Sequence, residues 1–390
     1  MAAARELGVA VTVASDRRSA LSAAMGERTL TLRLADPHHA AKTIALRAEQ
    51  TPFVAVVGVD DQGVMAAALA AERLGLAHNP VVAVSRTRDK AAMRIALATG
   101  SVSQPRFALL PAHTDIASVV EEVGLPCVLK PLSLSASRGV IRADDTPGAK
   151  AAAQRIRTIL RDAREDADAS LLVESYVPGA EVALEGLLCA GHLQTLAVFD
   201  KPDPLEGPYF EETLYITPSR LSASLVAEVQ RIAGVAARAL GLREGPVHAE
   251  LRVDGEHVSV LEVAARSIGG LCSRALRFGA GLGLEQVILR HALGLGVGDL
   301  IRERSAAGVM MIPIARAGTL VEVRGTATAR AVEGVAGLEI TIPAGRPVVP
   351  LPEGDRYLGF LFARGATAEA VERSLREAHS HLDVRIDAER

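Results

Sequence analysis

The sequence predicts an α/β protein of two or three domains. Three observations lead to this prediction. Apolar β-rich runs alternate with amphipathic stretches over residues 1 to about 98, hairpin signals follow in the middle of the chain, and β-rich, turn-rich sequence returns after about residue 305. At 390 residues the chain is long for one compact domain. We therefore expect domains over residues 1–98, 99–304 and 305–390.

The first domain is predicted to contain βαβ units around a parallel sheet. "GVAVTVAS" and "PFVAVVGVDD" have the pattern of strands, and "GVMAAALAAERLGLA" has the pattern of a helix. The chain opens on "AAARELG", a helix end, where such a domain normally begins with a strand, so the first strand is missing or supplied elsewhere. Asp60 and Asp61 would end a strand at the usual ligand edge, although helix capping and turn formation are the favoured roles.

The middle and C-terminal domains are predicted from turn and helix signals. Lys90 lies in the first turn of a helix, and "PGAKAAAQRIRTILRDARED" forms another helix behind its proline. A third, long helix is expected in "PSRLSASLVAEVQRIAGVAARALGL". The remaining expected elements are a strand over 125–131, a hairpin folded at Gly191-His192, a second hairpin around Asp254-Gly255-Glu256, and a final helix near 367–380 that closes a small α+β unit.

Composition excludes several classes of function. Hydrophobic residues make up 49% and charged residues 23%, as in a folded protein with ample core-forming material. The formal net charge of -3 predicts no binding to nucleic acid or to an anionic membrane surface. The three cysteines lie far apart, without zinc or disulfide spacing, and no signal core or membrane span is apparent, so a cytoplasmic location is expected.

Two acids in the second hairpin give the sharpest chemical signal. Glu250 and Glu262 both interrupt β-patterned sequence, and the midpoint of their positions, 256, falls inside the turn. In a symmetric register they face each other, which is unfavourable unless a positive group lies between them. Paired carboxylates are typical of Mg²⁺ sites in phosphoryl transfer. The alternative is that one of the two simply lies on a solvated face, because spacing alone does not fix the register.

A possible anion site follows from two further stretches. Arg266 comes four residues after Glu262 and just before Gly269 and Gly270, and its guanidinium can bind a carboxylate or phosphate through two parallel hydrogen bonds. Lys130 ends a buried-looking strand, where an ammonium is costly without an anion. The next residues, "PLSLSASRG", offer hydroxyls and backbone N–H groups. Lys130 and this loop therefore predict a phosphate clamp.

Other nucleotide-binding motifs are not found. The sequence contains no GxxxxGK[ST] motif, and the glycine runs at 279–283 and 294–298 fail the GxGxxG spacing. They are interpreted as turns at helix ends. His248 lies on the Glu250 side of its strand by the period of two, and a structural role is favoured over a catalytic one.

In this order, the motifs resemble those of the ATP-grasp superfamily of carboxylate-amine ligases, and among them the L-amino-acid ligases. The resemblance covers nearly the whole chain. It implies an ATP-grasp fold, in which two α+β subdomains clasp ATP, with a Rossmann-like N-terminal domain similar to that of biotin carboxylase and a small C-terminal α+β domain. The lid subdomain would comprise residues of about 125–177.

The resemblance also implies roles for individual residues. Lys90 and Lys130 would contact ATP phosphates, under a mobile flap that runs from Ser133 to Gly139. Lys201 resembles a basic residue aimed at the transferring phosphate, and Arg266 one that binds the acyl carboxylate or its adduct. The further implied contacts are flap residues Ser133, Ser135, Ser137, Arg138 and Gly139, adenine contacts through the backbones of Glu174, Ser175 and Val177, a ribose contact at Glu181, and Mg²⁺ or Mn²⁺ ligands at Glu250 and Glu262.

The implied reaction is ATP-dependent amide formation through an acyl phosphate. Its substrates would be a small carboxylate and an amine, in particular amino acids, and a homodimer is expected by analogy. Many ATP-grasp enzymes have Asn two residues after the second metal Glu, but this chain has Ala264 in "LEVAAR", a pattern similar to the L-amino-acid ligases. Two alternatives stay open: a carboxylase-type enzyme that phosphorylates bicarbonate, and an ATP-binding module without catalysis.

Overall fold

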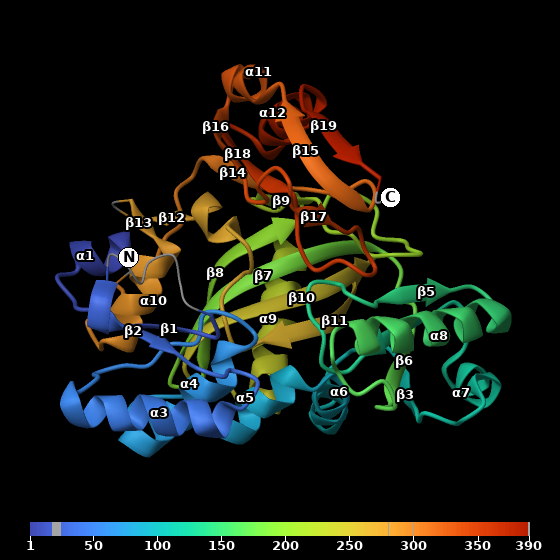
Figure 1. Ribbon diagram of the computed structural model, residues 1–390, viewed down its shortest axis with the longest axis horizontal. Coiled ribbons are helices and arrows are strands. Elements are labelled where there is room, and N and C mark those ends of the chain that lie inside the picture. The colour runs from blue at the N-terminus through green and yellow to red at the C-terminus, as the bar shows by residue number, and fades with distance from the viewer. Residues whose placement is uncertain (18–24, 280, 299, 389–390) are drawn as a thin grey trace.

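An eight-stranded antiparallel sheet runs through the middle of the molecule (Figure 1). The computed structural model of the chain describes residues 1–390 except 18–24, 280, 299 and 389–390. In spatial order the strands of this central sheet are β11 (His257–Ala264), β10 (Gly245–Asp254), β7 (Ala180–Cys189), β8 (His192–Asp200), β9 (Leu214–Thr217), β14 (Ala306–Ile312), β18 (Gly359–Gly365) and β16 (Val335–Ile340).

The central sheet continues into the predicted C-terminal domain. Strands β14, β16 and β18 all follow residue 305, yet they extend the sheet that begins with β7–β11. The last helix falls where the sequence predicts it and packs on β14 and β18, with Val371 and Leu375 buried. The other C-terminal elements are β15 (Gly318–Arg324), α11 (Thr326–Ala331), β17 (Pro347–Val348), α12 (Ala368–Ser380) and β19 (Asp383–Asp387).

A separate four-stranded sheet forms the arm at the right of Figure 1. Its strand order is β3-β6-β4-β5, and two helices bury apolar faces against it. The predicted strand over 125–131 and the helix behind the proline are both confirmed. The elements of this lid sheet are β3 (Phe107–Leu110), α7 (Ile116–Val123), β4 (Cys127–Pro131), β5 (Ile141–Ala143), α8 (Thr146–Asp162) and β6 (Leu171–Ser175).

The N-terminal region is mostly helical in its described part. Strands β1 and β2 pair in parallel; β1 confirms the strand predicted in "GVAVTVAS", whereas β2 lies where no strand was predicted. The strand predicted in "PFVAVVGVDD" was wrong, because within the described residues it joins no ladder. Phe53 and Val56 pack instead against helices α3 and α4. The elements of this region are α1 (Ala2–Glu6), β1 (Val13–Ser15), η1 (Gly26–Arg28), β2 (Thr29–Thr31), α3 (Pro37–Gln50), α4 (Gly63–Leu74), α5 (Val81–Arg88) and α6 (Lys90–Thr99).

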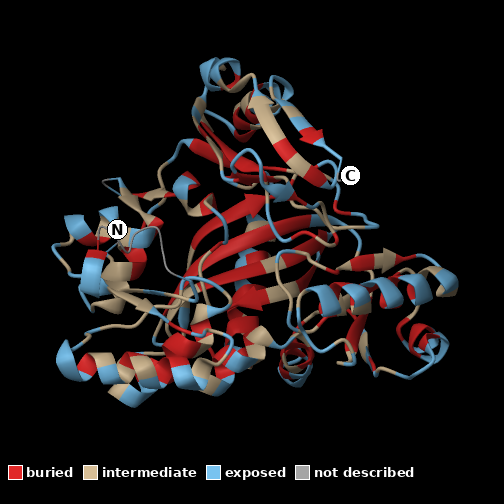
Figure 2. Ribbon diagram, in the orientation of Figure 1, coloured by how far each residue is buried: buried red, intermediate tan, exposed pale blue. Residues whose placement is uncertain are grey.

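Buried residues concentrate in the central sheet and the helix faces against it (Figure 2). The predicted long helix is α9 (Ala223–Leu240), which covers the β7–β11 end together with α6. The first hairpin turns at Ala190-Gly191, one residue before the predicted position. Both residues have positive φ, and two such residues suit the tightest hairpin turns. The remaining elements are η2 (Cys272–Ala275), β12 (Arg277–Phe278), β13 (Leu282–Gly283) and α10 (Leu284–Ala292).

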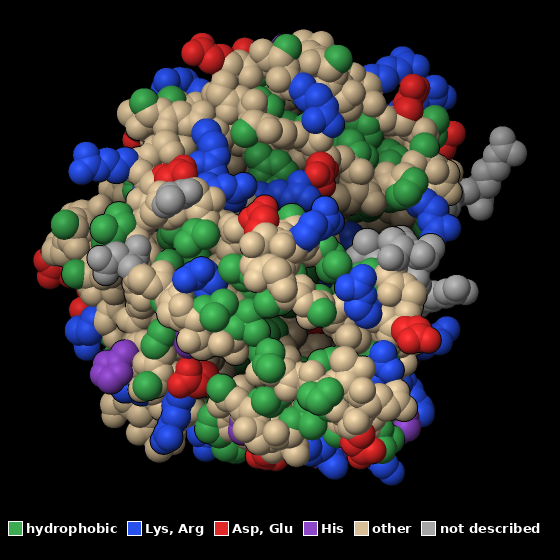
Figure 3. All heavy atoms as spheres, turned by 90° about the vertical axis from the view of Figure 1, so that its left-hand side faces the viewer, with side chains coloured by type: hydrophobic (Ala, Val, Ile, Leu, Met, Phe, Trp, Pro, Cys, Tyr) green, Lys and Arg blue, Asp and Glu red, His purple; other side chains and the backbone are tan. Residues whose placement is uncertain are grey.

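The surface carries charges of both signs. On the face drawn in Figure 3, lysine and arginine side chains lie among aspartate and glutamate side chains, as expected from a net charge of -3. Among the helices that the structure describes, none combines the length and the apolar character needed to cross a bilayer.

Candidate active site

Glu250 and Glu262 face each other on adjacent strands. The register of β10 and β11 pairs them directly, and directly paired residues project on the same face of a sheet. This pairing depends on a β-bulge, because Leu251 pairs with Val260 and leaves Leu261 as an extra residue. Without the bulge, Glu262 would point to the other face. The predicted opposition of the two acids is therefore confirmed, through a feature that the sequence did not reveal.

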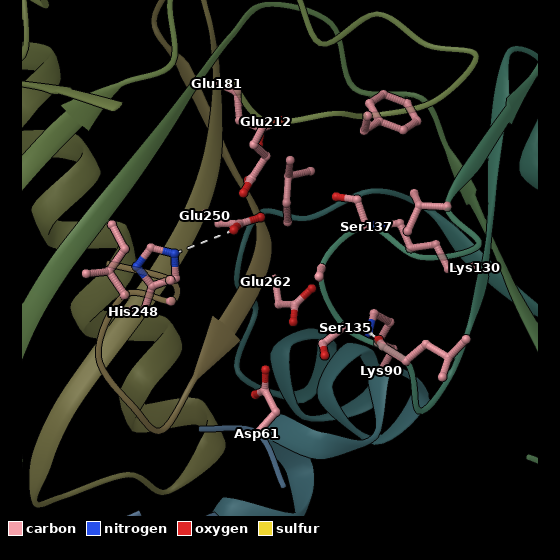
Figure 4. Close-up of a pocket in the computed structure, with 18 of the residues that line it drawn as sticks. Asp61, Lys90, Lys130, Ser135, Ser137, Glu181, Glu212, His248, Glu250 and Glu262 are labelled. Carbon is pink, nitrogen blue, oxygen red and sulfur yellow. Dashed lines mark hydrogen bonds and ion pairs between the residues drawn. The ribbon is translucent and has the colours of Figure 1, made fainter. Parts of the chain in front are cut away.

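The two acids line one cavity together with the predicted phosphate clamp (Figure 4). The cavity has a volume of about 540 Å³, and Lys90, Lys130, Ser135 and Ser137 line it from the opposite side. Lys90 Nζ donates to the backbone oxygen of Leu134, 2.6 Å away. Leu134 belongs to the segment 133–139, which we call the serine-rich loop. Carboxylates on one wall and cations with hydroxyls on the other form a polar cleft suited to a phosphorylated ligand with a bound metal ion.

Most, but not all, of the predicted site residues reach this cavity. Ser133, Arg138 and Gly139 belong to the serine-rich loop but do not line the cavity, and the Gly139 N–H donates to the Pro352 oxygen at 2.9 Å. Lys201 lies behind the cavity wall. The predicted residues that line the cavity are Lys90, Lys130, Ser135, Ser137, Glu174, Ser175, Val177, Glu181, Glu250, Glu262 and Arg266.

Lys201 lies at the centre of an acidic cluster. Its Nζ is 2.6 Å from Glu181 and 3.5 Å from Glu250, and it also pairs with Glu212. Burial disfavours its charge, but the three carboxylates outweigh burial and hold the pKa of Lys201 well above its ordinary value. For Glu212, burial and the charge of Glu250 prevail over Lys201 and raise its pKa to about 7. Burial would raise the pKa of Glu250 as well, but Lys201 and His248 hold it well below its ordinary value.

His248 lies between two carboxylates, those of Glu250 and Glu185. It lines the cavity, with Nδ1 3.3 Å from Glu185 and Nε2 3.5 Å from Glu250. Burial opposes its charge, but hydrogen bonds to both carboxylates raise the pKa of His248 to about 9. Glu185 also accepts a hydrogen bond from the Ile268 N–H, at 2.9 Å. The histidine thus lies within the site, as a charged partner of Glu250.

Arg266 has an acidic partner that the sequence reading assigned to a turn. Its Nη2 lies 2.8 Å from Asp61 Oδ2, and Arg88 Nη1 lies 3.0 Å from Asp61 Oδ1. Burial alone would raise the pKa of Asp61, but the neighbouring cations, chiefly Arg266, lower it below its ordinary value. Asp60, in contrast, accepts from the Gly63 N–H at 2.7 Å and has the capping role expected of it. Asp61 and Arg266 therefore bring opposite charges to one side of the cavity.

Arg94 is a buried cation that sequence reasoning missed. It lies on α6 with 2% exposure, and its Nε is 2.5 Å from Glu174. The other oxygen of Glu174 is 2.7 Å from Lys130 Nζ. Burial alone would raise the pKa of Glu174, but the two cations lower it to about 2. A signal for Arg94 was available, because it occupies the buried face of an alanine-rich helix, where a charge needs partners.

Glu181 also has both of its carboxylate oxygens engaged. Oε1 lies 2.6 Å from Lys201 Nζ, and Oε2 lies 2.9 Å from Arg252 Nε. The ligand oxygens of Glu181, Glu212 and Glu250 lie within 4.8 Å of one another. Glu212 was absent from the sequence prediction, and its position in "FEET" carries no motif that would have marked it.

Comparison with known proteins identifies three matching domain families along the chain. An ATP-grasp domain model matches residues 123–275, an L-amino acid ligase C-terminal domain 2 matches 310–387, and an ATP-grasp N-terminal domain matches 1–78. The chain is 28% identical over 239 residues to the alanine–anticapsin ligase of Bacillus subtilis, and 31% identical over 215 residues to the D-alanine–D-alanine ligase of Cupriavidus pinatubonensis. These alignments span 57% and 52% of this chain, and 50% and 62% of the relatives.

Solved structures extend the likeness to the whole fold. The L-amino acid ligase from Bacillus licheniformis superposes with a TM-score of 0.82 at 25% identity, over 99% of this chain and 95% of that one. Phosphoribosylglycinamide synthetase from Anaerococcus prevotii shares the fold alone, with a TM-score of 0.71 at 13% identity, over 99% of this chain and 95% of that one. With its central and lid sheets, paired carboxylates and these matches, the chain has the ATP-grasp fold and contains an ATP-grasp domain over residues 123–275.

Proposed function

We propose that the chain is an ATP-dependent ligase that joins a carboxylate to an amine and uses amino acids as substrates. The observation that carries the proposal is the single cavity in which Glu250 and Glu262 face Lys90, Lys130 and the serine-rich loop. The names of the relatives, which include an L-amino acid ligase and a D-alanine–D-alanine ligase, support the same reaction class.

The donor set fits a hard divalent cation. Glu250 and Glu262 offer carboxylate oxygens on one face of a hairpin, and Mg²⁺ and Mn²⁺ prefer such ligands together with phosphate oxygens. Glu181 and Glu212 lie beside Glu250, with ligand oxygens within 4.8 Å of one another, and this concentration of carboxylates would attract an added cation. When bound there, the ion would neutralise charge on the ATP phosphates during transfer.

The cavity offers complementary groups for the rest of the nucleotide. Lys90 and Lys130 supply positive charge for phosphates, and Ser135 and Ser137 supply hydroxyl donors. The segment 174–177 lines the same cavity at the lid sheet and offers backbone groups for the adenine, as the family resemblance implies. In this arrangement the triphosphate would lie between Lys130 on one side of the cavity and Glu250 and Glu262, with their metal ion, on the other.

For the proposed reaction, the protein mainly has to hold the substrates and ATP in the correct relative positions. A carboxylate oxygen of the first substrate attacks the γ-phosphorus, the bond to the bridging oxygen breaks, and ADP leaves. The amine of the second substrate attacks the resulting acyl phosphate and loses a proton, and inorganic phosphate departs with its bonding electrons to leave an amide. Arg266 would stabilise the negative oxygen that develops. The Asp61–Arg266 pair also matches the ammonium and carboxylate of an α-amino acid.

An ADP-release assay across a matrix of amino acids tests the proposal. The protein is incubated with Mg²⁺ and ATP, and products are identified by mass. We expect ADP release that requires both a carboxylate and an amine, and a product mass equal to their sum less one water. ADP release that depends on bicarbonate, or on neither substrate, would contradict the proposal.

A further inference from the structure

Arg94 joins the two walls of the cavity from behind. Its Nε bonds Glu174 at 2.5 Å, and Glu174 in turn bonds Lys130 Nζ at 2.7 Å. On its other side, Arg94 Nη1 donates to the Val260 oxygen at 3.2 Å, and Nη2 donates to the Leu261 oxygen at 2.5 Å. A continuous run of charge-assisted hydrogen bonds therefore leads from the lysine of the lid sheet to strand β11 of the central sheet.

The carbonyls that Arg94 holds belong to the bulge beside Glu262. Strand β11 is the outermost strand of the central sheet, so one edge of its backbone has no strand partner. Leu261 is the extra residue of the bulge, and the bulge determines that Glu262 faces the cavity. A side chain that fixes the Val260 and Leu261 oxygens therefore also fixes the direction of Glu262.

Only a guanidinium can make this set of contacts. Arginine carries five N–H donors in a rigid planar group, whereas the ammonium of lysine is a single compact centre. Gln104 supports the arrangement, since its Nε2 donates to the Arg94 backbone oxygen at 2.9 Å and its Oε1 accepts from Arg94 Nη1 at 3.3 Å. Arg94 is only 2% exposed, so its guanidinium is surrounded by these protein partners and has little contact with solvent.

We propose that Arg94 is a positioning residue that sets the separation between Lys130 and Glu262, so that the phosphates and the divalent cation of one metal–nucleotide complex are bound at once. The inference rests on the proposed function for its ligand, Mg·ATP. A different role, charge balance for buried Glu174 alone, predicts a loss of stability but no specific loss of the Mg²⁺ dependence of ATP binding.

Calorimetric titration of ATP at a series of Mg²⁺ concentrations separates these roles. Arg94→Lys keeps a positive charge near Glu174 but cannot hold both carbonyls. We expect its Mg²⁺ midpoint for ATP binding to rise about 10–100-fold, as for other residues that support metal ligands. Arg157→Lys is the matched control, because Arg157 also holds two backbone oxygens, those of Ala167 and Ala169, but does not line or support the cavity. Its midpoint should stay within twofold.

A second variant covers the case in which Arg94→Lys does not fold. Gln104→Leu acts only through Arg94, and we expect a several-fold rise in the same midpoint. Midpoints within twofold of wild type in the folded variants, with lower thermal stability as the sole effect, would overturn the inference and leave the proposed function standing. A wild-type protein with no Mg²⁺-dependent ATP binding would overturn the proposed function first, and this inference with it.

Discussion

Two carboxylates beside the cavity, buried Glu174 and partly exposed Glu250, have different surroundings. Glu174 has two cations of its own, Arg94 and Lys130, and its pKa lies at about 2. Glu250 shares Lys201 with two other acids and shares His248 with Glu185. The first cluster is complete without a ligand. The second shares its cations among several acids, and Glu181, Glu212 and Glu250 bring ligand oxygens within 4.8 Å of one another, a donor set suited to an added cation.

The largest effect should follow from a change at the opposed pair of acids, Glu250 and Glu262. Glu262→Gln removes one of two opposed metal-side carboxylates while its volume is kept. We expect ATP turnover to fall at least about 100-fold, because the divalent cation loses a charged ligand. Glu256→Gln in the exposed turn of the same hairpin is the control and should retain activity. Wild-type turnover in Glu262→Gln would show that the cation binds elsewhere.

Removal of the shared cation should destabilise the fold. Lys201→Met leaves Glu181 and Glu212 without their common partner, and loss of one member of a buried ion pair costs about 3–5 kcal/mol. Urea unfolding measures this difference. Because a divalent cation would restore positive charge, we also expect added Mg²⁺ to stabilise the variant more than the wild type. Arg231→Met, at an exposed helix pair, is the control and should leave the free energy of unfolding unchanged.

Part of the site could be predicted from sequence, because opposed residues and strand ends follow local rules. The positions of Glu250, Glu262 and Lys130 came from period-two patterning and turn chemistry. The bulge at Leu261 did not, since a one-residue insertion in a ladder leaves no pattern in an apolar run. Without that bulge, Glu262 would lie on the opposite face of the sheet from Glu250, and the predicted opposition of the two acids would have been wrong.

Contacts between residues far apart in the chain could not be predicted from the sequence. Arg94 meets Leu261 from 167 residues away, and Asp61 meets Arg266 from 205 residues away. Local patterns can mark such a residue as out of place on a buried face, but they do not name its partner. The continuation of the central sheet into β14 and β18 was missed for the same reason, since edge pairing between distant strands depends on the whole fold.

The complete cluster predicts a specific pH dependence of stability. The folded-state pKa of Glu174, about 2, lies below its ordinary 4.5, so its contribution is fully present above pH 4.5 and is lost as pH falls toward 2. The difference between these pKa values corresponds to roughly 3 kcal/mol. We expect the stability gap between wild type and Glu174→Gln to be constant near neutral pH and to narrow below pH 4.5 in urea unfolding. A gap that does not change with pH would contradict this account of Glu174.

The smallest effect concerns an exposed contact that joins the lid sheet to the C-terminal strands. Arg155 on α8 binds Glu353 through both oxygens, at 2.6 and 3.0 Å, and both side chains are about two-fifths exposed. An exposed pair stabilises a fold by less than about 1 kcal/mol, so Arg155→Ala should barely change the unfolding midpoint. The pair nevertheless links helix α8 of the lid sheet to the C-terminal segment between β17 and β18, and its loss would leave the lid sheet freer to move away from the cavity. We therefore expect a few-fold faster release of bound nucleotide in stopped-flow displacement, whereas Arg161→Ala, on the same helix but bonded within it to Thr158, should leave the release rate unchanged. Equal release rates in all three proteins would contradict a role of this contact in nucleotide exchange.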